Sequence, residues 1–528
     1  MTVSEWRKTT ISTVCICLLL LSLHGLSLTT VAMEGRTWTV DDDGPADHRK
    51  IQHAVNNASD GDTILVRPGT YFENLVVNKS VSIFGEDHIT TVIDGNDGTK
   101  AVTLTANGIV LSGFTIRGGD EGLLIVANDN NVTGNVFVNN PLGVILDSGC
   151  EGNVLFDNEI VLSRTYGVYG DRCGTNIIAQ NDISLNGWHG VYLYGSAPCV
   201  FENNTIFSNG MDGVRIRYSS NNTIRGNIFS SNDNGLCIYS DEDPLRPSGL
   251  SKYNMIEKNT LMNNSCAIRI EHAAKSVTIA GNVVRDNSLE YNSVGLNISG
   301  SNGNFVFHND FVNNSKQASI HESVNNAWDE GYIVGGNYWS DHNSTDLHWG
   351  TGQNQTGSDG VADSAYVVSV NPDEKDVYPF VRSGVWLEPL TVSIISPING
   401  MYRPGPIPLI VSINKPVWVS YSLDGEPNVT VVEDIMLVGL AVGPHNMLVS
   451  ANDTLNNESS SEVSFVVTFL GDLSLDGVVN IIDIAVVAFS FGHYVGSERW
   501  NPNADLNTDG QINIVDIATV AKEFGSEI

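Results

Sequence analysis

Basic residues are scarce in this chain of 528 residues. Lysine and arginine together number 27, against 60 aspartate and glutamate residues, which gives a net charge of −33. Because such a charge repels phosphates and anionic lipid headgroups, nucleic acids and anionic membranes are excluded as partners. Charged residues make up only 16% of the chain and glycine is abundant, which favours turn-rich β structure over helices. The length exceeds that of one ordinary globular core, so several domains are expected.

Long apolar runs are absent except near the N-terminus. There, Arg7 and Lys8 precede the apolar residues 11–28, and Thr30-Val31-Ala32 offers small residues for cleavage. This is the layout of a secretory signal peptide, which we place at residues 1–32. An uncleaved membrane anchor is the alternative, because the run is almost long enough to span a bilayer. After signal removal no membrane span is expected, and the protein is predicted to be secreted or associated with the cell surface.

An internal repeat built around asparagine runs through the first two thirds of the chain. Comparable asparagines follow one another at steps of 23, 23, 23, 23, 32, 23 and 27 residues: Asn135, Asn158, Asn181, Asn204, Asn227, Asn259, Asn282 and Asn309. The residues three positions before and two positions after each asparagine are apolar. The first residue of the earlier set is Val132, the last is Val306, and Ile279 is the one before Asn282. A unit of 23 residues suits one coil of a parallel β-helix, in which three short strands joined by bends stack at about 4.8 Å.

The predicted fold class is therefore mainly β, with a right-handed parallel β-helix over residues 33–384. Stacking superposes equal positions, so the apolar ones form inner ridges and the asparagines form structural ladders. Residues 51–77 are typical of a short amphipathic helix, a Gly-Asp turn and two strands, and the helix is expected to cover the open end of the stack. This segment resembles the start of right-handed β-helix proteins of the pectate-lyase-like class.

Cysteine is scarce as well. Of the seven cysteines, Cys15 and Cys17 lie in the signal peptide, and no CxxC pair indicates metal or redox work. The other five are expected to be small buried hydrophobic residues: Cys150, Cys173, Cys199, Cys237 and Cys266. Cys150 and Cys173 each stand fifteen residues after a repeat asparagine, on adjacent coils. A disulfide between these two is one hypothesis for a secreted chain, and free thiols are the alternative.

Each coil also carries a strand that opens with glycine or alanine, and side chains two and four positions later should point outward. These positions supply the candidate substrate-binding residues Tyr169, Tyr192, Tyr194, Arg215, Arg217, Tyr239 and Arg269. Tyrosine rings stack on sugars and arginines bind sugar carboxylates, so extracellular polysaccharide is the predicted ligand. A solvated face with ordinary cross-strand pairs is the alternative. Extra residues near 240–252 and 288–291 are expected to flank this strand and to wall a groove.

Catalysis on this face stays an open question. The motif Gly187-Trp188-His189-Gly190, followed by Arg215 and Arg217, loosely resembles the polygalacturonase pattern. That family also needs clustered aspartates, and one coil here offers only Asp171. A β-eliminating lyase needs a base, for which the arginines are candidates. The candidate catalytic residues are Arg215, Arg217, Asp171 and Glu271, for a polysaccharide lyase or glycoside hydrolase acting on acidic sugars.

The end of the repeat region carries a family resemblance. Residues 307–344 run from an asparagine-rich coil into Gly335-Gly336-Asn337-Tyr338-Trp339-Ser340-Asp341, which resembles the C-terminal end of the NosD-type β-helix family. The likeness continues through residues 358–368 and 378–380. NosD is linked to the maturation of copper sites, but no cluster of His, Met and Cys here supports copper.

The remaining chain predicts two further domains. Residues 385–470 show alternating strands broken by Pro-Gly, Asp-Gly and Gly-Pro turns, which resembles an Ig-like β-sandwich. Residues 471–528 contain two twelve-residue loops, 33 residues apart, each followed by a helix. This pair resembles a small α-helical type I dockerin, which implies two Ca²⁺ ions and a cohesin-type partner. Oxygen ligands are expected at positions 1, 3, 5, 7, 9 and 12, with glycine at position 6.

The first loop supplies Asp472, Ser474, Asp476, the Val478 carbonyl, Asn480 and Asp483, and the second supplies Asp505, Asn507, Asp509, the Gln511 carbonyl, Asn513 and Asp516. Serine at position 3 predicts weaker binding in the first loop. Cohesin contact is expected at positions 10 and 11, which are Ile481-Ile482 and Ile514-Val515.

The sequence as a whole predicts a secreted modular protein that binds or processes extracellular polysaccharide and docks through its dockerin. A non-catalytic cell-surface or structural binding protein is the alternative, and a NosD-like metal-site accessory protein is a further one.

Overall fold

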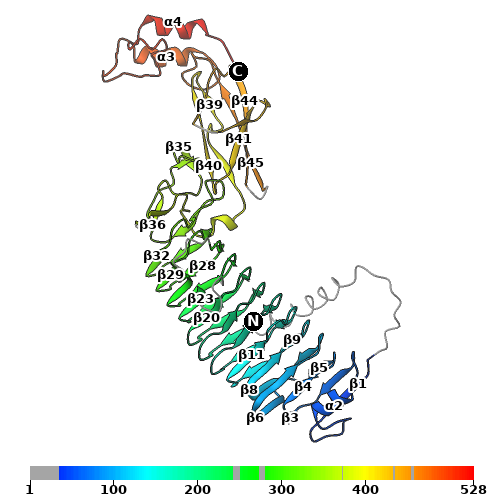
Figure 1. Ribbon diagram of the computed structural model, residues 1–528. Coiled ribbons are helices and arrows are strands. Elements are labelled where there is room, and N and C mark those ends of the chain that lie inside the picture. Colours follow the sequence, from blue (N-terminus) through cyan, green and yellow to red (C-terminus); the bar gives the residue numbers. More distant parts are fainter. Residues whose placement is uncertain (1–34, 242–249, 273–279, 371–372, 432–433, 454–456) are drawn as a thin grey trace.

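The computed structural model describes residues 35–528 except 242–249, 273–279, 371–372, 432–433 and 454–456. The predicted signal peptide lies outside the described residues. The fold is mainly β: a solenoid with coils of about 23 residues leads into further β-sheets and then a small helical region (Figure 1). The predicted fold class is therefore confirmed. Within the described ranges, no helix has the length and apolarity needed to cross a membrane.

Three parallel sheets form the solenoid, with one strand from each coil in each sheet. The first sheet holds, in order, β1 (Thr37–Val40), β2 (Thr63–Val66), β5 (Ser82–Gly85), β7 (Val110–Ser112), β9 (Asn131–Thr133), β12 (Val154–Phe156), β15 (Ile177–Ala179), β18 (Val200–Glu202), β21 (Thr223–Arg225), β24 (Met255–Glu257), β27 (Val283–Arg285) and β30 (Phe305–Phe307).

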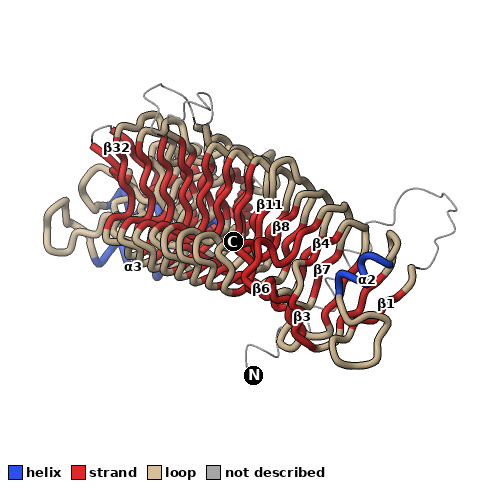
Figure 2. The backbone as a smooth tube through the Cα atoms, turned by 60° about the horizontal axis from the view of Figure 1, so that its bottom comes forward, coloured by secondary structure: helices blue, strands red, loops and turns tan. Residues whose placement is uncertain are grey.

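The second and third sheets share two long strands. The second sheet holds β3 (Gly69–Phe72), β6 (Thr91–Leu104), β8 (Thr115–Ile125), β10 (Val136–Val138), β13 (Glu159–Val161), β16 (Asp182–Ser184), β19 (Thr205–Phe207), β22 (Ile228–Ser230), β25 (Thr260–Met262), β28 (Ser288–Glu290), β31 (Asp310–Val312) and β33 (Tyr338–Trp339). The third holds β4 (Leu75–Val77), the far ends of β6 and β8, β11 (Leu142–Leu146), β14 (Val168–Asp171), β17 (Val191–Tyr194), β20 (Asp212–Arg217), β23 (Asn234–Ser240), β26 (Cys266–His272), β29 (Val294–Ser299) and β32 (Lys316–His321). Figure 2 shows these rows side by side.

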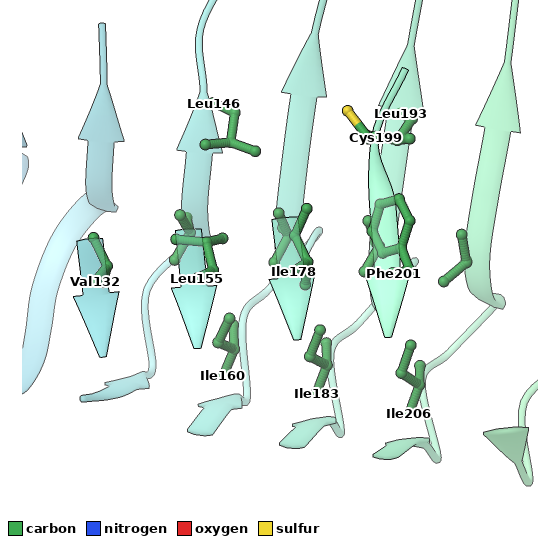
Figure 3. Packing of buried hydrophobic residues seen from close by; sticks show 14 of the residues in the cluster. Val132, Leu146, Leu155, Ile160, Ile178, Ile183, Leu193, Cys199, Phe201 and Ile206 are labelled. Atoms are coloured by element: carbon green, nitrogen blue, oxygen red, sulfur yellow. The ribbon is translucent and has the colours of Figure 1, made fainter. Parts of the chain in front are cut away.

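The core consists of ridges of apolar side chains that repeat from coil to coil. Val132, Leu155, Ile178 and Phe201 follow one another in the first sheet, at most 1% exposed, and Ile160, Ile183 and Ile206 do so in the second (Figure 3). Burying such side chains out of water is the main favourable term in folding. The register predicted from the asparagine spacing is confirmed over these coils.

Buried asparagines form ladders along the bends. The backbone N–H of Asn181 donates to Oδ1 of Asn204 on the next coil at 2.9 Å, and the Asn181 amide donates to the carbonyl of Leu155 on the coil before. The same pattern recurs through Asn135, Asn158, Asn181, Asn204, Asn227, Asn259, Asn287, Asn309 and Asn337. Each amide thus satisfies backbone groups that a bend removes from the sheet.

The predicted register was wrong at one coil. The ladder passes from Asn259 to Asn287, whereas Asn282 belongs to a parallel ladder between Asn254 and Asn304. The extra residues of this coil therefore lie between β26 and β27, not at residues 288–291, which include the regular strand β28. Ile279, taken as a core position, lies outside the described residues. Two asparagines five residues apart in one coil are chemically alike, so spacing alone selected the wrong one.

Both ends of the apolar core are covered. Helix α2 (Ile51–Asn57) buries Ile51, Ala54 and Val55 at the N-terminal end, beside β1, β2 and β4 (Figure 1), which confirms the predicted cap. At the other end Trp339 stacks on Phe311 with ring centroids 4.2 Å apart. Its indole N–H donates to the buried carboxylate of Asp376 at 2.8 Å.

The segment after the solenoid forms two sheets around a shared core. One contains β34 (His348–Trp349), β35 (Gln355–Ser358), β38 (Val392–Ser396), β40 (Ile407–Ile413) and β43 (Ile435–Leu437), and the other contains β39 (Met401–Tyr402), β41 (Trp418–Leu423), β42 (Val429–Thr430), β44 (Gly443–Asn452) and β45 (Glu458–Val467). A hairpin of β36 (Tyr366–Val370) and β37 (Asp373–Asp376) and a 3-10 turn, Val385–Leu387, precede most of them. The predicted boundary at residue 384 stays a prediction, since β35 before it pairs with β40 after it.

All five cysteines in the described chain are free and buried, so the hypothesised Cys150–Cys173 disulfide is not formed. Side chains at equal positions of stacked coils point in parallel directions. Their Cβ atoms therefore keep roughly the coil spacing of about 4.8 Å, more than the about 3.8 Å of a disulfide. The Cys173 thiol instead lies 3.4 Å from the Ser196 hydroxyl.

We predict that Ile224→Asp unfolds the neighbouring coils, because Ile224 is fully buried in a continuous ridge and the variant buries an unpaired charge. The expected loss in the free energy of unfolding is about 4 kcal/mol or more. The matched control is Ile228→Asp, since Ile228 is 43% exposed. Denaturant unfolding of both variants measures the difference, and equal stability of the two would contradict the register.

We also predict a pH-dependent contribution from Asp310, which is buried and accepts hydrogen bonds from the Ser383 hydroxyl and Gly384 N–H. Burial raises its pKa from 3.8 to about 6, and the nearby Glu290 charge adds to the rise. The folded carboxyl therefore holds its proton over a pH range in which the unfolded one has lost it. Its contribution to stability is present below pH about 4 and is lost by pH about 6, an effect of at most about 3 kcal/mol.

The variant Asp310→Asn should make the free energy of unfolding fall less steeply between these two pH values. Urea unfolding of both proteins at each pH measures the change. An unchanged slope would contradict the assignment.

Candidate functional site

The third sheet presents three columns of polar and aromatic side chains at its outward surface, here called the outward face. The column nearest the start of the strands holds Tyr166, His189, Asp212, Asn234 and Cys266. The next holds Tyr169, Tyr192, Arg215, Cys237 and Arg269, and the last holds Asp171, Tyr194, Arg217, Tyr239 and Glu271. All nine substrate-binding and catalytic candidates therefore lie on one face, in the predicted order.

Aromatic side chains gather at one end of the outward face. The Tyr166 ring stacks on His189 with centroids 5.7 Å apart and an interplanar angle of 10°, and it lies 5.6 Å from Tyr169 and 5.2 Å from Tyr192. Trp188 meets Tyr166 edge to face and is 49% exposed. Burial raises the pKa of Tyr169 to about 12, so its hydroxyl stays protonated at neutral pH.

A buried carboxylate, Asp212, organises the middle of this face. Its Oδ2 lies 3.2 Å from His189 Nδ1 and accepts from the Arg215 guanidinium at 3.0 Å, while its Oδ1 accepts from the Asn234 amide at 2.6 Å. Burial raises the pKa of Asp212, but hydrogen bonding with His189 and Asn234 and the charge of Arg215 outweigh it and hold that pKa below its usual value. Asp212 is therefore ionised and paired.

The other arginines of the outward face are paired as well. Arg217 donates to Asp241 at 2.8 Å and to the hydroxyls of Tyr192 and Tyr218. Arg269 lies 2.7 Å from the Glu271 carboxylate. The two acids named as catalytic candidates are thus engaged, Glu271 with Arg269 and Asp171 with Arg172 at 2.7 Å. The catalytic and binding roles stay predictions.

The expected groove walls are only partly placed. Of residues 240–252, those at 242–249 lie outside the described residues. The second insertion lies between β26 and β27 and includes residues 273–279, which also lie outside the described residues. Both insertions follow a strand of the third sheet, β23 or β26, so the expectation that one of them precedes it was wrong.

Five functional candidates were missed or underused by reasoning from the sequence: Tyr166, His189, Asp212, Asn234 and Asp241. The first four occupy the position directly before the small residue that opens each strand of the third sheet. Tabulating that position in the 23-residue alignment would have found them. Asp241 follows a strand end, where no repeat position marks it.

Copper was not expected from the sequence, in spite of the resemblance to NosD. Among the described residues, the one group of three His, Cys, Asp or Glu side chains with ligand atoms within 4.8 Å of one another is Asp41, Asp42 and Asp43. Three carboxylates suit hard cations, whereas copper prefers imidazole and sulfur ligands. The alternative role as a metal-site accessory protein stays a prediction.

The C-terminal loops show the same bonding pattern twice. The aspartate at position 1 accepts a hydrogen bond from the backbone N–H of the glycine at position 6. Asp472 accepts from Gly477 at 3.0 Å, and Asp505 accepts from Gly510 at 2.9 Å. The aspartate at position 12 accepts a hydrogen bond from the backbone N–H of the asparagine at position 9 at 2.8 Å. This bond is part of a capping box at the start of α3 (Ile481–Phe489) in the first loop and of α4 (Ile514–Lys522) in the second. Both glycines have φ above 80°, which a side chain would strain.

This donor set fits Ca²⁺. The carboxylates of Asp472, Asp483 and Asp516 are fully buried, and the side chains at positions 1, 3, 5, 9 and 12 of both loops carry oxygen atoms. Carboxylates gathered without a cation repel one another, and hard oxygens are the ligands that Ca²⁺ prefers. When bound, the ion would be held by the six residues predicted for each loop, and its positive charge would offset the repulsion between their carboxylates.

The β-sandwich contacts these loops directly. The Thr468 hydroxyl, one residue after β45, donates to Asp472 Oδ2 at 2.5 Å. Arg403, after β39, donates to the Leu470 carbonyl and, at 2.7 Å, to the Asn503 carbonyl ahead of the second loop. The predicted cohesin-contact residues are exposed: Ile481 66%, Ile482 53%, Ile514 65% and Val515 48%.

Solved structures similar to this one share little sequence with it. The A-module of a mannuronan C-5 epimerase from Azotobacter vinelandii is 14% identical, covers 52% of this chain and 91% of its own, and has a TM-score of 0.41. A DFA-IIIase from Arthrobacter chlorophenolicus is 14% identical, covers 56% and 95%, and has a TM-score of 0.43. At these values neither indicates an activity for this chain.

A cell surface glycoprotein of Methanothermus fervidus is 36% identical over 105 residues, which is 19% of this chain and 17% of that protein. This chain therefore spans less than a fifth of that relative. Residues 470–525 match the dockerin type I domain. Residues 55–243 and 186–344 match the family described as "Periplasmic copper-binding protein (NosD)", and together they cover more than half of the chain. The chain belongs to the NosD family and carries a C-terminal dockerin type I domain.

Proposed function

We propose that this protein binds polysaccharide outside the cell through the outward face of its β-helix and docks through its dockerin to a cohesin-type partner. The observation that supports polysaccharide binding is the cluster of Tyr166, Tyr169, Tyr192 and Trp188 on the parallel third sheet. Aromatic faces with a polar rim are suited to sugar rings. Binding is proposed in preference to cleavage because Asp171 and Glu271 are held in ion pairs.

The extracellular location is part of the proposal. It is supported by the predicted signal peptide, by the dockerin type I match and by the partial likeness to a cell surface glycoprotein. The exposed pairs Ile481-Ile482 and Ile514-Val515 are the proposed cohesin contacts.

We predict that the protein binds at least one class of polysaccharide, and that Tyr192→Ala weakens this binding about tenfold because a stacking surface is lost. The matched control is Tyr291→Ala, which removes an exposed tyrosine from a bend outside the outward face. Isothermal titration with oligosaccharides chosen from a glycan array measures both variants. Equal weakening by the two, or no glycan bound at all, would overturn the proposed site.

We further predict that Ca²⁺ stabilises the C-terminal domain of the full-length protein. A ligand that binds only the folded state adds about 4 kcal/mol at a thousandfold excess over its Kd. Asp505→Ala combined with Asp516→Ala should remove calcium binding to the second loop, as measured by calorimetry. This loop should bind Ca²⁺ more tightly than the first, since Ser474 weakens calcium binding there. The control Asp373→Ala removes an exposed carboxylate elsewhere. Unfolding curves that coincide in Ca²⁺ and in chelator would refute the calcium assignment.

A further inference from the structure

Each of four arginines on or beside the outward face is ion-paired with one of this protein's own carboxylates. Arg215 is bonded to Asp212, Arg217 to Asp241, Arg269 to Glu271, and Arg172 to Asp171, all at 3.0 Å or less. The Arg217 guanidinium donates to both carboxylate oxygens of Asp241, at 3.0 and 2.8 Å. A guanidinium whose charge is balanced by a neighbouring carboxylate attracts an incoming anion less strongly than a free one does.

A sugar carboxylate would therefore have to displace a protein carboxylate. Displacement leaves the protein's own acid without its partner in a partly buried position, which is costly. The Arg215 pair is the most enclosed, since Asp212 is only 1% exposed and also holds Asn234. Asp147, at the equivalent outward position one coil before Asp171, adds a further negative charge. The outward face thus carries no excess of positive charge among the described residues.

The aromatic surfaces remain as the binding features of this face. The rings of Tyr169 and Tyr192 on successive coils have centroids 5.7 Å apart, and Trp188 is half exposed beside Tyr166. Stacking on such rings depends on apolar sugar faces and hydroxyl groups and requires no ligand charge.

We infer that the outward face takes a neutral polysaccharide, not an acidic one as the arginine-rich sequence pattern suggests. This inference rests on the proposed function and narrows its substrate class. A repeating linear polymer matches the geometry because the columns themselves repeat with the coil spacing of the sheet. A folded protein partner would have no such period.

One cation lies beside the face without a partner in the described part of the chain. Arg164, in the bend before Tyr166, is exposed and makes no ion pair there. Because an exposed charge is screened by salt, its contribution to anion binding would disappear at high ionic strength.

The first test compares neutral gluco- and xylo-oligosaccharides with oligogalacturonate of the same length, by titration of the full-length protein. A neutral oligosaccharide should bind with a Kd that changes less than about twofold between NaCl concentrations of about 0.05 and about 0.5 M. Trp188→Ala, at a half-exposed position, should weaken this binding, and Tyr291→Ala should not.

The second test frees the Arg217 guanidinium from its ion pair with Asp241. Asp241→Asn removes the carboxylate that occupies Arg217 and should raise the affinity for oligogalacturonate about tenfold or more, while the affinity for the neutral oligosaccharide changes little. Glu271→Gln, which frees Arg269, should act in the same direction. Circular dichroism and thermal unfolding of both variants check that they fold.

The outcomes separate the two proposals. Binding of oligogalacturonate by the unmodified protein, tighter than any neutral sugar and unchanged by Asp241→Asn, overturns the inference and leaves polysaccharide binding standing. Binding of no sugar of either class by the unmodified protein overturns both. Binding of a protein but of no glycan assigns the face to a macromolecular partner and also overturns both.

Discussion

The hydrogen bond from each bend asparagine to the next coil is the interaction on which the solenoid depends. A bend cannot continue the sheet hydrogen bonds, and the bends here also place residues such as Asp157, Gln180 and Asn203 at positive φ. The buried side-chain amide that follows each of them accepts from a backbone N–H of the preceding coil, and it donates to a carbonyl of that coil and to the amide oxygen of the next asparagine, as Asn181 does. Removing an amide would leave backbone groups of the preceding coil unsatisfied, so the ladder holds the bends in one register.

Fixed register has a direct consequence for the surface. Because each coil sits on the last without slippage, a side chain that faces outward on one coil lies beside its equivalent on the next. Tyr169, Tyr192 and Arg215 become neighbours in space although 23 residues separate each from the next. The solenoid thereby turns a sequence period into columns, and different residue types at one position give an aromatic end and an ion-paired centre.

The modules after the solenoid are joined by more than a linker. Thr468 and Arg403 of the β-sandwich bond to the first dockerin loop and to the segment before the second. Burial lowers the pKa of Arg403 there. These bonds connect the dockerin to the sandwich, while the residues proposed for cohesin contact stay exposed.

Much of this molecule follows from local sequence. The repeat spacing predicted the coils, because stacking demands an apolar side chain at the same place in every coil. The two acidic loops predicted the dockerin, because the ligands of this loop type lie within twelve consecutive residues. The sequence also predicted which tyrosines and arginines share a face. It did not predict that Asn287 and not Asn282 continues the ladder, since both have the residue type that the position needs.

Only the tertiary structure decided how the charges of the outward face are used. The partners of Arg215, Arg217 and Arg269 are Asp212, Asp241 and Glu271, and Asp241 lies beyond the regular strand positions that the repeat marks. Whether a guanidinium is free or ion-paired depends on side-chain conformations and distances, which a linear pattern does not contain. The sequence therefore determined where the arginines stand. The conformations of side chains within β20 and β26, and the packing of one coil on the next for Arg217 and Asp241, determined that they are paired.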